Sequence, residues 1–138
     1  MAVWPVDAET GRVEVQRIVT AQDVGFAINP TGVVGQIEGG ATQALGYALT
    51  EELKFDARGL VNADLKDYLL PTSVDAPPIE AIIVQSPSVE GPHGMKGAGE
   101  PPVTTPAAAI ANAIRAAVGT APHEVPMTPE RVWRALKG

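Results

Sequence analysis

Residues 91–102 read GPHGMKGAGEPP and form the most informative segment of the chain. The first ten of them hold four glycines and a single carboxylate, that of Glu100. Because glycine lacks a Cβ atom, the glycines at 94, 97 and 99 allow a tight turn or the close approach of another molecule. Proline fixes its own φ and disfavours helical geometry in the preceding residue, so Pro101 should keep Glu100 out of a helix. The pattern predicts a bare strip of backbone that ends in one positioned acid.

The glycines do not match the common phosphate-binding or hydrolase loops. Gly97-Ala98-Gly99 lacks the third glycine of a dinucleotide fingerprint, and no Gly-Lys-Ser/Thr sequence follows it. The Gly-x-Ser-x-Gly sequence of a hydrolase elbow is also absent. Such a segment can be a plain connection between elements. If it carries chemistry, a carboxylate held by a glycine strip favours proton abstraction at a bound cofactor or substrate.

A second glycine-rich segment is predicted to be a long helix. Asn29-Pro30 is a typical helix start, a cap residue followed by proline in the first turn, and the helix should run from about Thr31 to Leu49. It contains glycines at 32, 35, 39, 40 and 46, and each interior glycine costs up to about 1 kcal/mol relative to alanine. Either close packing or a bare surface that faces a cofactor would explain them.

Three segments together resemble a known family. They are, in order, GQIEGGATQALGYALTEE at 35–52, DYLLPT at 67–72 and KGAGEPP at 96–102. Their order and spacing resemble those of the molybdopterin-binding large subunits of the xanthine dehydrogenase and aldehyde oxidase family, the molybdenum hydroxylases. The resemblance covers roughly residues 13–136, but it corresponds only to the C-terminal end of a much longer subunit.

The resemblance implies a role for each residue of the two motifs. Glu100 corresponds to the catalytic base beside the molybdenum, and Gln36 to a glutamine that contacts the molybdopterin. The backbone N–H groups of Gly97, Ala98 and Gly99 correspond to cofactor-binding groups. Lys96 belongs to the same cofactor-binding strip, through its backbone or as a salt-bridge partner that holds the loop. The family uses no protein ligand to the metal, and His93 and His123 lack metal-ligand spacing.

The resemblance also implies a reaction and partners. The reaction is the hydroxylation of an aldehyde or N-heteroaromatic substrate with water as the oxygen source. The molybdenum–molybdopterin cofactor would be shared with a larger subunit, and whether it carries a cytosine dinucleotide is left open. Iron–sulfur subunits, and as an open alternative flavin subunits, would complete the assembly. This chain has no cysteine, so it cannot hold an iron–sulfur cluster through thiolates.

The length suggests one domain, residues 1–138, interpreted as a C-terminal fragment or split subunit that is inactive alone. Two alternatives stay open: a non-catalytic remnant or stand-alone interaction domain that retains the fold, and an unrelated small ligand binder. The net charge of −6 opposes nucleic-acid binding. No apolar run approaches the roughly 18 residues of a membrane span. The absence of cysteine fits a reducing cytoplasm, which is the expected location.

The remaining pattern predicts an α+β fold in which mixed strands carry the glycine-rich helix and two C-terminal helices. The first two strands should form a hairpin, Thr105 should cap the first C-terminal helix with Gly119 ending it, and Trp133 should anchor the second. Tyr68 is expected to be half-buried. The expected strands are 1–6, 12–20, 51–55 and 79–85, and the expected C-terminal helices are 106–118 and 129–136.

Overall fold

The computed structural model describes residues 2–138, with side chains described from residue 6 onward. A three-stranded sheet has the order β1-β2-β5, formed by Ala2–Val6, Val13–Asp23 and Ile79–Val84. β1 pairs antiparallel with β2, which confirms the predicted hairpin for the described residues. β2 runs three residues further than predicted and pairs in parallel with β5, from Ile18 opposite Ile79 to Asp23 opposite Val84. The parallel pairing requires a long crossover, which α1 provides.

Helix α1 spans Pro30–Leu49, in agreement with the sequence prediction. Asn29 caps it as expected, because its Oδ1 accepts a hydrogen bond of 3.0 Å from the N–H of Gly32. The 20-residue helix is about 30 Å long. One stripe of α1 is buried and contains small residues with one isoleucine and one leucine: Ile37, Gly40, Ala41, Ala44, Leu45, Gly46 and Ala48.

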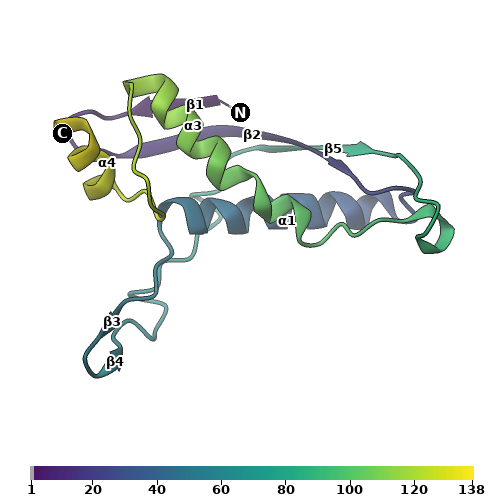
Figure 1. The fold of residues 1–138 in the computed structure, drawn as a ribbon, viewed down its shortest axis with the longest axis horizontal. Coiled ribbons are helices and arrows are strands. Elements are labelled where there is room, and N and C mark those ends of the chain that lie inside the picture. The colour runs from purple at the N-terminus through teal and green to yellow at the C-terminus, as the bar shows by residue number, and fades with distance from the viewer. Residues whose placement is uncertain (1) are drawn as a thin grey trace.

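The helices cover one face of the sheet. α1 packs over β5 and the 13-residue helix α3, Pro106–Val118, packs over β1, while the two helices contact each other (Figure 1). Between these layers lies the core, in which Ile110 and Ile114 of α3 are completely buried. The short helix α4, Pro129–Lys137, lies beside β1 and β2 near the C-terminus (Figure 1). The predicted α+β class is therefore confirmed.

Two expectations about the C-terminal helices need correction. Thr105 occupies the cap position of α3, but its side chain makes no capping bond, because its helical φ and ψ of −98° and −28° continue the preceding turn. Trp133 does not anchor α4, since it is 40% exposed and Val132 is the buried residue. Gly119 ends α3 as predicted, with a φ of +85°.

The predicted strand at residues 51–55 is also wrong. Glu51 instead turns inward, and its carboxylate lies against the bare backbone of Gly46 and accepts a 2.7 Å hydrogen bond from the hydroxyl of Tyr68. Tyr68 is half-buried, as expected, and this carboxylate raises its pKa to about 12. Only a two-residue pair remains, β3 at Phe55–Asp56 and β4 at Gly59–Leu60, in an arm that projects from the body (Figure 1).

Within residues 2–138, no helix is both long enough and apolar enough to cross a bilayer.

The two adjacent glycines of α1 should respond oppositely to alanine. A Cβ atom on Gly40 would lie 2.7 Å from Cβ of the buried Pro102, whereas one on Gly39 would meet nothing within 4 Å. We expect Gly40→Ala to lower the free energy of unfolding by roughly 1–3 kcal/mol through overpacking. Gly39→Ala should raise it by up to about 1 kcal/mol, because alanine is the better helix former. Chemical denaturation of both variants measures the difference, and an equally stable Gly40→Ala protein would contradict the packing argument.

Candidate functional site

The two glycine-rich motifs meet in the folded chain. A Cβ atom on Gly99 would lie 3.7 Å from Oε1 of Gln36, so the α1 side chain faces the glycine strip directly. The topology explains this meeting, because parallel strands β2 and β5 end at the same edge of the sheet. The segments that follow them, residues 24–29 before α1 and residues 85–100, therefore lie next to each other. Sites between such strand ends are a common place for ligands in α/β proteins.

The surface around this meeting point is bare backbone. Cβ atoms on Gly35, Gly39 and Gly97 would meet nothing within 4 Å, and Gly35, Gln36 and Gly39 are all exposed. Among the described residues, the N–H groups of residues 97–99 donate no hydrogen bond to a protein acceptor. The site thus offers three backbone donors and one side-chain amide on a surface without Cβ atoms. These groups fit a large polar ligand that approaches the backbone closely.

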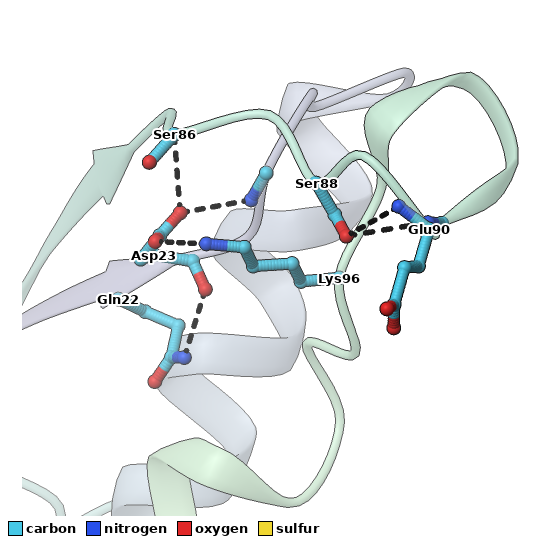
Figure 2. A network of polar contacts seen from close by, with 8 residues as sticks. Gln22, Asp23, Ser86, Ser88, Glu90 and Lys96 are labelled. Atoms are coloured by element: carbon cyan, nitrogen blue, oxygen red, sulfur yellow. Dashed lines mark hydrogen bonds and ion pairs between the residues drawn. The ribbon is translucent and has the colours of Figure 1, made fainter.

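Asp23 holds this loop in place, as Figure 2 shows. Its carboxylate accepts hydrogen bonds from the N–H of Gly25 at 3.0 Å and of Ser86 at 3.1 Å. The same carboxylate forms an ion pair of 2.5 Å with the ammonium group of Lys96. Lys96 is the first contributor to the lowered pKa of Asp23, and the Gly25 bond is the second. One carboxylate therefore ties the end of β2 to the segments on both sides of the 3-10 turn at Pro92–Gly94.

Backbone contacts complete the attachment of the loop. The N–H of Lys96 donates to the carbonyl of Val24 at 2.9 Å, and the N–H of Phe26 donates to the carbonyl of Gly94 at 2.9 Å. Gly25 adopts a φ of +64° and lies directly against the Gly94 carbonyl, where a Cβ atom would clash. Only glycine satisfies both requirements at this position.

Glu100 lies at the far end of the strip, and its conformation differs from the prediction. Its φ and ψ are −82° and −35°, which is helical geometry, because the Val103 N–H donates to its carbonyl at 3.0 Å and starts the short helix α2, Pro101–Thr104. The residue before a proline is biased against this region, but the packing of Pro102 against Gly40 overrides the bias. The Glu100 side chain is exposed, so its carboxylate is available to a ligand.

The fold brings the site residues predicted from the sequence close together, but the Lys96 side chain points away from the others. Gln36, Gly97, Ala98, Gly99 and Glu100 form one continuous surface. The Lys96 side chain turns to Asp23, which is the loop-holding alternative of the two considered for it.

Asp23 and Gly25 were not identified from the sequence. The local signal was an aspartate two residues before a glycine at the end of a strand, which does not reveal a partner 73 residues away.

The histidines take no part in this surface. His93 is exposed in the 3-10 turn with a φ of +53°, and His123 is exposed, as expected, in the segment before α4. Within residues 2–138, no group of three or more potential metal-binding side chains comes together. The donor set consists of amide and backbone N–H groups, so it suits an organic cofactor that brings its own metal ligands.

Comparison with known proteins identifies the family. The model of the molybdopterin cofactor-binding domain matches residues 1–77, more than half of the chain. The chain belongs to this family. It is 41% identical over 96% of its length to the nicotine 6-hydroxylase large subunit of Paenarthrobacter nicotinovorans. It is 39% identical over 93% of its length to a putative xanthine dehydrogenase molybdenum-binding subunit of Escherichia coli. The family resemblance inferred from the sequence motifs is confirmed.

The fold agrees with solved structures of the same kind. Quinoline 2-oxidoreductase from Pseudomonas putida 86 matches 96% of this chain with a TM-score of 0.88 and 38% identity. An aldehyde oxidoreductase from Desulfovibrio gigas matches with the same TM-score and 36% identity. The chain spans 17% of the length of the first relatives that it matches and 17% of the quinoline enzyme. The matched segment is therefore a small part of each relative.

The Asp23–Lys96 pair should make the loop sensitive to acid. The folded-state pKa of Asp23 is lowered, so its stabilisation is present above the usual aspartate pKa near 4 and is lost as pH falls through the lowered value. We expect Lys96→Met to be less stable than the wild type at pH 7, with the difference shrinking as the pH falls below about 4. Denaturation at several pH values measures this difference, and hydrogen exchange of residues 93–100 should be faster in the variant.

Lys66→Met is the matched control, because Lys66 is exposed in the arm, far from Asp23. It should leave both the pH dependence and the exchange of residues 93–100 unchanged. An equal effect of both substitutions would show that net charge, rather than the ion pair, controls the loop.

Proposed function

We propose that this chain forms one wall of the molybdenum cofactor site of a molybdenum hydroxylase, an oxidoreductase. The observation that carries this proposal is the contact between Gln36 and the glycine strip that leads to Glu100. That contact unites on one exposed surface the groups that the family resemblance assigns to cofactor binding and to proton transfer. The cofactor is molybdenum–molybdopterin, shared with a larger polypeptide.

Each group has a separate task in this proposal. The Gln36 amide hydrogen-bonds the pterin, and the N–H groups of residues 97–99 bind it through the bare backbone. Lys96 belongs to this strip through its backbone. Its ammonium group stays paired with Asp23, and this ion pair holds the loop in one conformation. Preorganised donors of this kind cost no reorganisation when the cofactor binds.

The reaction adds oxygen from water to a carbon atom and releases two electrons and two protons. When bound, the cofactor supplies the two-electron oxidation and passes the electrons on to partner subunits. Glu100 accepts one proton from the water-derived oxygen as this oxygen attacks the carbon, through its exposed carboxylate. We propose aldehydes or N-heteroaromatic compounds as the substrate class, because relatives are named for nicotine, xanthine and quinoline.

The larger polypeptide is part of the proposal because the chain supplies an open surface rather than an enclosed pocket. Gln36 and Glu100 are both exposed, whereas ligand sites bury most of the surface of what they bind. We therefore propose activity only in an assembly, which we place in the cytoplasm, with iron–sulfur partners as electron acceptors and a flavin partner as an open alternative. A non-catalytic remnant of the same fold is the competing function.

Cofactor content in protein isolated from its native cells is the first test. We expect near-stoichiometric molybdenum together with a larger polypeptide that purifies with the chain. Gln36→Leu should lower the pterin content by weakening binding roughly 2- to 10-fold, the effect of losing one hydrogen bond. Gln43→Leu, two turns along the same helix, should leave it unchanged. Metal-free protein without a partner would reject the proposal in favour of the remnant.

The role of Glu100 has its own test in the assembled protein. Glu100→Gln should lower kcat by about 10²- to 10⁴-fold, the usual contribution of a general base, while the molybdenum content stays the same. Glu90→Gln is the control, because Glu90 is an exposed acid of the same loop outside the strip. Normal turnover of the Glu100→Gln protein would contradict the assignment of the base.

A further inference from the structure

The projecting arm presents an unusual amount of apolar surface. We define the apolar arm as residues 53–74, which include β3 and β4 and leave the body of the molecule at the C-terminal end of α1 (Figure 1). Of the 17 exposed large apolar residues in the described chain, eight lie in this segment of 22 residues. They are Leu53, Phe55, Leu60, Val61, Leu65, Leu69, Leu70 and Val74.

The apolar arm has no core of its own. Asn62 is its single buried residue and is polar: its Oδ1 accepts a 2.8 Å bond from the Lys54 N–H, and its Nδ2 donates to the Glu52 carbonyl at 2.6 Å. The β3–β4 pair consists of two residues per strand, all of them exposed. An isolated two-stranded hairpin is marginally stable in water. Within the described residues, the apolar side chains of the arm are therefore left exposed instead of packed into a core.

The charges of the apolar arm do not explain it either. The segment carries Lys54, Arg58 and Lys66 against three aspartates, so it has no net charge. A groove of about 1070 Å³ extends its apolar surface at the base, lined by Leu45, Leu49, Leu69, Leu70 and Val74. Leu69, Leu70 and Val74 belong to both the arm and the groove, so the two form one exposed apolar surface, the kind of surface that marks an interaction site.

We propose that the apolar arm and its basal groove dock on the separate, larger molybdenum-binding polypeptide with which the chain is proposed to share its cofactor. The comparisons identify this occupant. The match to quinoline 2-oxidoreductase covers 96% of this chain, so at most about six residues lie outside it and most of the 22-residue arm lies within it. This chain makes up only 17% of that protein, so the relative has much further chain beside the segment that matches the arm.

The surface lies apart from the cofactor site. Gln36 and the glycine strip are near the N-terminal end of α1, whereas Gly46 and Glu51, at the base of the arm, are at its C-terminal end. Docking through the arm therefore adds to the proposed function, on which it rests, without using the same residues. Substitutions in the arm should affect assembly while the cofactor-facing surface stays intact.

The test compares capture of the larger polypeptide by wild-type and variant chains from native cells. Phe55 and Leu65 are 69% and 74% exposed, so Phe55→Asp with Leu65→Asp should leave the fold intact, as circular dichroism would check. We expect this double variant to bind the captured, molybdenum-containing polypeptide at least about 100-fold more weakly. Val125→Asp, 56% exposed and outside the arm, should bind like the wild type.

The possible failures are distinguishable. If the wild-type chain captures the molybdenum-containing polypeptide and the double variant captures it equally well, the docking proposal is wrong and the proposed function stands. If the wild type captures no such polypeptide, the proposed function falls and the docking proposal falls with it. If the isolated chain dimerises and the double variant is monomeric, the surface belongs to a second copy, which also overturns the proposal.

Discussion

The contact between Pro102 and the bare backbone of Gly40 is the constraint on which the arrangement of the site depends. It joins the middle of α1 to the end of the glycine strip at van der Waals distance, where even a methyl group on Gly40 has no room. With Asp23 fixing the start of the strip through Lys96, both ends of residues 96–102 are held. The segment between them can then stay free of side chains and of internal hydrogen bonds without losing its shape.

This arrangement explains the glycines of α1, which are costly for a helix. They serve three different surfaces. Gly40 admits Pro102, Gly46 admits the carboxylate of Glu51, and Gly35 and Gly39 leave backbone open beside Gln36. The glycines lower the intrinsic helix propensity of α1. Close packing on its other side, where small residues contact the sheet and α3, stabilises the helix instead. Packing therefore explains Gly40 and Gly46, whereas the open backbone at Gly35 and Gly39 supports the second explanation, which stays a proposal.

The long helix also separates the two surfaces proposed for the chain. Its N-terminal half belongs to the proposed cofactor surface, and its C-terminal end carries the apolar arm. A domain that forms one wall of a site must be held against the other walls. The proposed docking surface, beyond the C-terminal end of α1, would do this without competing for the residues of the proposed cofactor surface.

The sequence by itself determined the local elements and the family. The cap at Asn29-Pro30, the stop at Gly119 and the hairpin of the first two strands depend on neighbouring residues, and the structure confirms them. The motifs at 35–52 and 96–102 also indicated the family, because residue types and their order can be read directly from the sequence.

Only the tertiary structure decided how the site is built. The Asp23–Lys96 pair joins residues far apart in the sequence, and the parallel pairing of β2 with β5 creates the edge where both motifs meet. Glu100 is helical against its local bias because Pro102 packs on α1, and Glu51 leaves its predicted strand because the hydroxyl of Tyr68, 17 residues away, holds its carboxylate. In each case a contact between distant segments outweighs a local preference of at most a few kcal/mol, and such contacts cannot be read from neighbouring residues.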